Sequence, residues 1–135
     1  MAIETTSLEQ LPAEMYRLLD DLQTGSVAAL LTEDAQGIDE LSRSWLRGRE
    51  ALEAYLDEVK LVVGDLHSTI RDLHAIDWGD TGAVTFVLEQ TYTYDGRRTR
   101  ITCPTTFLCR REHGRWRIAV LHSMPLPEES EPLES

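Results

Sequence analysis

Glu89 stands first among the side chains whose type and position could carry chemistry in this sequence. It lies in the middle of an alternating stretch, 83–94, with Val87 and Thr91 on its own face. An apolar wall disfavours the charged form of a carboxylate, which makes that carboxylate a usable base near neutral pH. We therefore predict that Glu89 is a catalytic base in a pocket and that Thr91 lines the same wall. The alternative is that this face is solvated and Glu89 is an ordinary surface acid.

His122 is the second catalytic candidate, as a hydrogen-bond donor or a proton relay. It closes another alternating stretch, 115–124, whose inner row is predicted to be Trp116, Ile118, Val120 and His122. The other row carries Ala119 and Leu121, so this strand is apolar on both sides. We expect one side to lie under helices, with His122 at a pocket mouth, and the other side to meet a second subunit. The alternative for His122 is a structural histidine bonded to a backbone carbonyl.

Two periodicities predict the elements that must position these side chains. Apolar residues recur at helical spacing after Pro12, whose missing N–H is tolerated in a first turn, and Gly25 is predicted to end this helix. After Gly64 the period changes to two, and Asp95-Gly96 has the composition of a tight hairpin turn. The predicted elements are a helix from Pro12, a short helix at 27–31, a short strand at 37–41, a helix at 48–59, and strands at 67–78, 83–94, 98–111 and 115–124.

This order predicts an α+β fold, with a cone-shaped, curved antiparallel sheet packed on three N-terminal helices. Strands of this length curl, and helices on one face of a curled sheet enclose a conical cavity. The opposite face stays uncovered and carries apolar residues, so we expect a homodimer through the sheet face. A single domain is predicted at 11–125, between an N-terminal extension, 1–10, and a disordered acidic tail, 126–135.

Charge and hydropathy argue against several classes of function. The chain carries a formal net charge of −11, and residues 1–66 hold 14 acidic side chains against 5 basic ones. Such a surface repels phosphate backbones, so we expect no nucleic-acid partner. The sequence shows neither a signal peptide nor the ~20 consecutive apolar residues of a membrane span. We therefore expect no membrane partner and a cytoplasmic location.

The cysteines and histidines do not form a metal-binding pattern. Cys103 and Cys109 would lie roughly 20 Å apart on one extended strand, too far for a disulfide within it. We interpret them as small core residues of a reduced protein. His67 and His74 are predicted to lie on opposite faces of their strand, so they are not expected to converge on one ion. Phosphate-loop and dinucleotide motifs are missing, and we expect neither a cofactor nor a metal.

Four stretches, in this order, resemble the nuclear transport factor 2-like superfamily: GSVAALLTEDA (25–35), GREALEAYL (48–56), GDTGAVTF (79–86) and TFLCRREHGRWRIAVLHSMP (106–125). Within it the chain looks most like SnoaL-like proteins, ketosteroid isomerase-like proteins and the association domain of calmodulin-dependent kinase II. The resemblance implies a cystatin-like α+β cone, a dimer through the sheet and a ligand pocket at the wide end. Members include isomerases and cyclases as well as scaffolds without catalysis.

Further pocket candidates come from the resemblance and from aromatic side chains, such as Trp45 and Tyr55, that are large enough to line a cavity. In the isomerases, a tyrosine from the region of Tyr16 can supply a hydrogen bond to an oxyanion. Isomerase-like members carry a base near the short strand that holds Asp39 and Glu40. Core packing is the alternative for the aromatic candidates. The residues predicted to line the ligand pocket are Tyr16, Asp39, Trp45, Tyr55 and Thr91.

Two functions are compatible with these residues. The first is a pocket for a small, mostly apolar organic molecule, with metal-free acid–base chemistry of isomerase or cyclase type. The second is a non-catalytic association or ligand-sensing homodimer. The family often ends the last strand on His-x-His-x-Ser, whereas Val120 and Met124 replace the first histidine and the serine here. A salt bridge between Glu89 and an arginine such as Arg71 would favour the second function.

Overall fold

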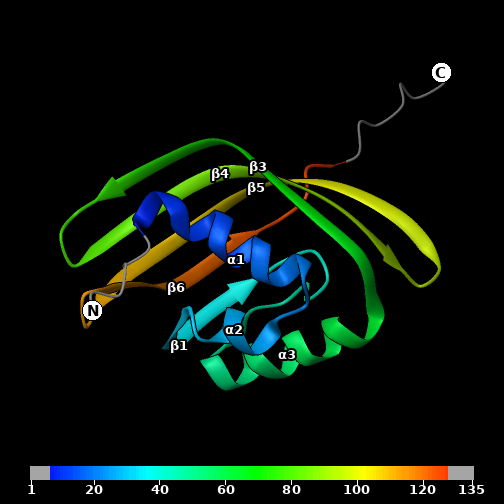
Figure 1. Ribbon diagram of the computed structural model, residues 1–135, viewed down its shortest axis with the longest axis horizontal. Coiled ribbons are helices and arrows are strands. Elements are labelled where there is room, and N and C mark those ends of the chain that lie inside the picture. The colour runs from blue at the N-terminus through cyan, green and yellow to red at the C-terminus, as the bar shows by residue number, and fades with distance from the viewer. Residues whose placement is uncertain (1–6, 128–135) are drawn as a thin grey trace.

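A curved six-stranded sheet wraps around helices on its concave side in the computed structural model, which describes residues 7–127 (Figure 1). The predicted α+β cone is therefore confirmed. Most of the predicted extension, 1–10, and of the predicted acidic tail, 126–135, lies outside the described residues. The elements are η1 (Leu8–Gln10), α1 (Leu11–Asp20), α2 (Thr24–Ala28), β1 (Leu31–Ile38), β2 (Leu46–Arg47), α3 (Arg49–Val62), β3 (Val63–Asp77), β4 (Thr81–Tyr94), β5 (Arg97–Glu112) and β6 (Arg115–Ser123).

The first helical segment starts with a capping box and ends earlier than predicted. The Ser7 side chain accepts a hydrogen bond from the Gln10 backbone N–H, and the Gln10 side chain accepts one from the Ser7 backbone N–H. At the other end Leu22 takes a left-handed conformation, with φ 55°, and Gln23 N–H donates to the Leu18 carbonyl. This C-cap turns the chain before Gly25, so α2 begins at Thr24 instead of after Ser26.

The sheet has the order β2-β1-β6-β5-β4-β3, and its four long strands form the predicted antiparallel meander. The short strand predicted at 37–41 is instead the eight-residue β1, which pairs in parallel with β6. Because β1 ends at Ile38, the residues from Asp39 onward form a loop before β2. A hydrogen bond from Tyr55 of α3 to Asp39 joins this loop to the helix.

A bulge in β3 changes which face its histidines share. The register between β3 and β4 shifts between Arg71 and His74, where Asp72 has φ 55°. His67 pairs with Thr91 and His74 pairs with Thr85, so both histidines lie on the outer face of the sheet. The prediction that they lie on opposite faces was therefore wrong. Among residues 7–127, no group of three or more side chains suited to metal binding is found.

A second bulge, at Ala119 in β6, changes the inner row of the last strand. Cys109 pairs with Ile118 but Leu108 pairs with Val120, which leaves Ala119 as the extra residue. The inner row therefore begins as predicted, with Trp116 and Ile118, and then continues as Leu121 and Ser123. Val120 and His122 move to the outer face, contrary to the predicted alternation.

The core lies between α1 and the concave face of the sheet. Tyr16 contacts two aromatic rings of that face, Phe86 at a centroid distance of 6.0 Å and Phe107 at 6.1 Å. All three side chains are buried, and Phe86 meets Phe107 edge to face. This aromatic cluster is part of the main buried core.

Candidate ligand pocket

A cavity of about 90 Å³ opens between the helices and the inner face of the sheet, at the end of the cone that α3 covers. Most of its wall is apolar, and the helices, β1 and the sheet all contribute side chains. The apolar lining includes Met15, Leu19, Leu31, Leu52, Leu56, Val59, Leu66, Leu88, Ile101 and Leu121. A mainly apolar cavity with a few polar groups is the usual form of a small-molecule site.

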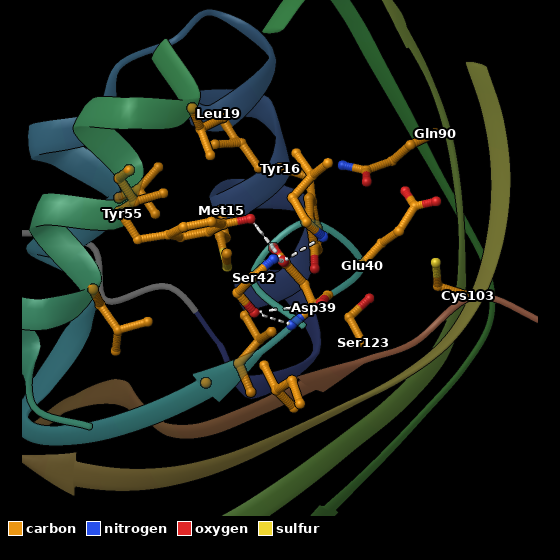
Figure 2. A pocket seen from close by; sticks show the side chains of 18 of the residues that line it. Met15, Tyr16, Leu19, Asp39, Glu40, Ser42, Tyr55, Gln90, Cys103 and Ser123 are labelled. Atoms are coloured by element: carbon orange, nitrogen blue, oxygen red, sulfur yellow. Dashed lines mark hydrogen bonds between the residues drawn. The ribbon is translucent and has the colours of Figure 1, made fainter. Parts of the chain in front are cut away.

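Asp39 lies on the helix side of this cavity and holds the loop in place (Figure 2). Its carboxylate accepts hydrogen bonds from the Tyr55 hydroxyl, at 2.6 and 2.9 Å, and from the backbone N–H groups of Leu41 and Ser42, at 3.1 and 2.9 Å. Burial, and then the charge of Asp39, raise the pKa of Tyr55 above its ordinary value. Tyr55 therefore stays protonated and remains a donor to Asp39.

Glu40 leaves the same loop in the other direction and extends toward the sheet, from which Gln90 and Cys103 line the cavity (Figure 2). The Tyr92 hydroxyl donates to Glu40 Oε2. In the part of the chain that the structure describes, this is the only hydrogen bond to the Glu40 carboxylate. Burial, and then the hydrogen bond with Glu40, raise the pKa of Tyr92. Glu40 thus presents a carboxylate to the cavity with free accepting capacity.

Buried hydroxyl and thiol groups face the cavity from the sheet and from α1. The Ser123 hydroxyl lies 2.8 Å from the Thr105 hydroxyl. Burial is the main cause that raises the pKa of Tyr16, and a hydrogen bond with Ser123 opposes the shift. Burial also raises the pKa of the Cys103 thiol to about 11. These groups are neutral donors at physiological pH and carry no charge into the cavity.

Three of the five predicted pocket residues line the cavity: Tyr16, Asp39 and Tyr55. Thr91 does not, because β4 directs its odd-numbered residues to the outer face between 83 and 93. Its hydroxyl accepts a hydrogen bond from Arg98 there. Trp45 follows the loop of Asp39 but remains 39% exposed outside the cavity.

Neither predicted catalytic residue lines the cavity. Glu89 shares the outer face with Thr91 and forms ion pairs with Arg71, at 3.3 Å, and with Arg100, at 4.0 Å. The bulge in β6 places His122 on the outer face, where its ring centroid lies 6.0 Å from that of Trp45. The expectation that these two residues face a pocket is corrected by the register of their strands.

The resemblance made Glu40, together with Asp39, a candidate base near the short strand, but Glu40 was not among the predicted pocket residues, and neither were Gln90, Cys103 and Ser123. One signal was available for Gln90, because it shares the parity of Phe86 and Leu88 on β4. Alternation along β6 could not predict that Ser123 faces the cavity, because the bulge at Ala119 reverses which residues point inward.

The curved sheet with helices on its concave side is the fold of solved structures described as nuclear transport factor 2-like with a cystatin-like fold and as ketosteroid isomerase-like. Solved structures with this fold match nearly the whole chain at low identity. The chain belongs to the SnoaL-like domain family, whose model matches residues 8–127. Among functionally curated proteins, none matches it significantly.

Three similar structures illustrate the fold. A Xanthomonas campestris protein named for the calcium/calmodulin-dependent protein kinase II association domain has 20% identity and a TM-score of 0.77, over 95% of this chain and 99% of the other. A ketosteroid isomerase-like protein from Erwinia carotovora atroseptica has 21% identity and a TM-score of 0.75, over 93% and 99%. A Catenulispora acidiphila protein in complex with S-DNPA has 20% identity and a TM-score of 0.73, over 87% and 90%.

Within residues 7–127, no helix combines the length and the apolar character needed to cross a membrane.

Proposed function

We propose that the cavity binds a small, mostly apolar organic molecule and that Glu40 exchanges a proton with it, in chemistry of isomerase or cyclase type. One observation carries this proposal: the Glu40 carboxylate enters a largely apolar cavity and accepts one hydrogen bond, from Tyr92, among the described residues. A carboxylate with free accepting capacity in such surroundings is suited to general base catalysis.

The proposed step is removal of a proton from a carbon next to a carbonyl group. The C–H bond breaks, the proton moves to Glu40, and the electron pair shifts to the carbonyl oxygen. Tyr16 supplies a buried phenol that can donate a hydrogen bond to that oxygen as its charge develops. Return of the proton from Glu40 to a different carbon completes an isomerisation. Asp39 positions the loop, because its oxygens already accept from Tyr55 and from two backbone N–H groups.

Hydrogen–deuterium exchange tests this proposal without knowledge of the natural substrate. A panel of cyclic ketones and enones in D₂O is followed by NMR for protein-dependent loss of the protons next to the carbonyl. We expect exchange with the wild-type protein and a loss of about 100-fold or more in Glu40→Gln, the range typical of a general base. The matched control is Glu33→Gln, which removes one charge from an exposed position outside the cavity. Equal exchange by Glu40→Gln and wild type, or none across the panel, contradicts the catalytic role.

A second candidate function is a non-catalytic, homodimeric association or ligand-sensing domain. Its support is on the outer face of the sheet, where Glu89 is held in ion pairs with Arg71 and Arg100 and is not free to act as a base. Leu108 is 42% exposed on the same face and pairs with Val120. We propose that a second copy of the chain covers this face.

A further inference from the structure

We infer that the cavity selects an organic amine, bound as its ammonium ion beside Glu40 with its apolar body among the leucines, and that it rejects organic anions. This inference rests on the proposal that the cavity binds a small molecule, and it is independent of proton transfer by Glu40. It concerns the charge of the ligand, which the wall of the cavity determines.

The charged groups that line the cavity all have the same sign. Asp39 and Glu40 contribute carboxylates, whereas no lysine, arginine or histidine lines it among the described residues. The arginines on the neighbouring strands lie on the outer face, where Arg71 and Arg100 form ion pairs with Glu89 and Arg98 donates to the Thr91 hydroxyl. A carboxylate or phosphate entering the cavity would lose its hydration and find no cation, which is costly.

The two carboxylates differ in the capacity they leave for a ligand. Asp39 accepts from Tyr55 and from two backbone N–H groups, and so its lone pairs are largely occupied. Glu40 accepts only from Tyr92 within the described part of the chain, and through one oxygen, Oε2. The other oxygen of Glu40 is therefore the natural acceptor for an N–H group of a ligand.

The surroundings of Glu40 suit an ammonium group better than a hydroxyl. An ammonium has three N–H donors and a charge that strengthens each bond to a carboxylate. Gln90 lines the same cavity, and its amide nitrogen donates to Ser68, which leaves its amide oxygen as a second acceptor.

The rest of the cavity wall determines which hydrocarbon group the ligand can carry. Beyond Glu40 the wall is formed by side chains such as Leu52, Leu56, Leu88 and Ile101. Burial of a ring or branched alkyl group against them supplies the apolar part of the binding free energy. The expected ligand class is therefore a primary or secondary amine on a compact hydrocarbon body.

Three probes that share a 2-phenylethyl body and differ in the charge of the head group test the inference by calorimetric titration at pH 7: 2-phenylethylamine, 2-phenylethanol and 3-phenylpropionate. We expect the amine to bind the wild-type protein roughly tenfold more tightly than the alcohol, the increment typical of a charged hydrogen bond. The carboxylate is expected to bind most weakly. This order is measured on the wild-type protein and does not depend on the folding of any variant.

Variants then test whether Glu40 is responsible for the preference for the amine over the alcohol. Glu40→Gln keeps an acceptor for Tyr92 and is expected to bring the amine and the alcohol to within about twofold of each other. Glu33→Gln changes the net charge by the same amount at an exposed position and is expected to keep the tenfold preference.

Two results would overturn the inference. One is amine binding no tighter than alcohol binding, which includes the case where none of the three probes binds. The other is an equal loss of preference in Glu33→Gln and Glu40→Gln. Equal binding of all three probes would contradict charge selection while leaving the cavity as a binding site, and the deuterium exchange assay decides the catalytic proposal separately.

Discussion

The Tyr55 hydroxyl donates to both carboxylate oxygens of Asp39, at 2.6 and 2.9 Å, and this contact joins α3 to the loop that carries Glu40. Asp39 is thereby turned toward the helices, whereas the next residue is turned toward the sheet (Figure 2). Two adjacent acids that both line the cavity therefore have different hydrogen-bond partners: Asp39 accepts from Tyr55 and the loop backbone, and Glu40 accepts from Tyr92. The position of Glu40 depends on the anchoring of its neighbour.

Removal of the Tyr55 hydroxyl should loosen this loop. Tyr55→Phe leaves Asp39 part-buried with only its backbone donors, and the loss of a hydrogen bond to a charged group is expected to lower the free energy of unfolding by about 1–3 kcal/mol. Urea denaturation measures this change, and faster amide exchange at Leu41 and Ser42 would place it in the loop. Tyr94→Phe is the control, because Tyr94 is 42% exposed, and it should change stability by less than about 0.5 kcal/mol. Equal stability of the two variants would contradict the anchoring role.

Much of the fold could be predicted because its signals are local. The change of period after Gly64 predicted the meander, and Asp95-Gly96 and His113-Gly114 mark its hairpin turns with positive φ at all four residues. The third helix was predicted from Ala51, Leu52, Tyr55, Leu56 and Val59 on one face, and all of these except Ala51 line the cavity. Each of these features depends on neighbours within a few residues.

The site was harder to predict because it depends on bulges and on a long-range contact. One extra residue, Ala119, transfers His122 to the outer face and Ser123 to the inner face. For β4, both faces of the strand carry apolar residues, such as Val87 and Leu88, so alternation alone could not orient Glu89. The pairing of Asp39 with Tyr55 spans sixteen residues and has no pattern in the sequence.

Gly82 is required where β4 passes under the first helical turn. A Cβ atom at this position would lie 2.7 Å from Leu8 Cδ2 and 2.9 Å from the Ile76 backbone oxygen, which are both too close. Gly82→Ala should therefore lower the free energy of unfolding by about 1–3 kcal/mol through overpacking. Gly25→Ala is the matched control, since α2 leaves nothing within 4 Å of the new atom, and it should be neutral or stabilising by up to about 1 kcal/mol. Urea midpoints compare the two, and a tolerated Gly82→Ala would contradict the tight contact.

The buried thiols should make stability fall with alkaline pH. Burial raises the pKa of Cys103 to about 11 and that of Cys109 to about 12, whereas an unfolded thiol titrates near pH ~8.5. The folded state holds these protons more tightly, so their contribution is complete below about pH 8.5 and is lost as the pH rises toward the folded values. Urea midpoints between about pH 7 and pH 9.5 should decline, and a Cys103→Ala, Cys109→Ala double variant should decline less. Identical slopes for the two proteins would rule out the thiols as the cause.

Leu108 offers the sharpest test of the proposed dimer. Its side chain projects from the outer face of β5, opposite Val120, so Leu108→Glu places a charge on that face without entering the core. Burial of an unpaired carboxylate between two copies is costly, and we expect the wild-type dimer to become a monomer in light scattering coupled to gel filtration. Leu61→Glu is the control, because Leu61 is 85% exposed on α3, away from the sheet, and this variant should stay dimeric. Circular dichroism should be unchanged in both. The proposal that a second copy covers the sheet would be contradicted if the wild-type protein were monomeric at tens of micromolar, or if both variants dissociated equally.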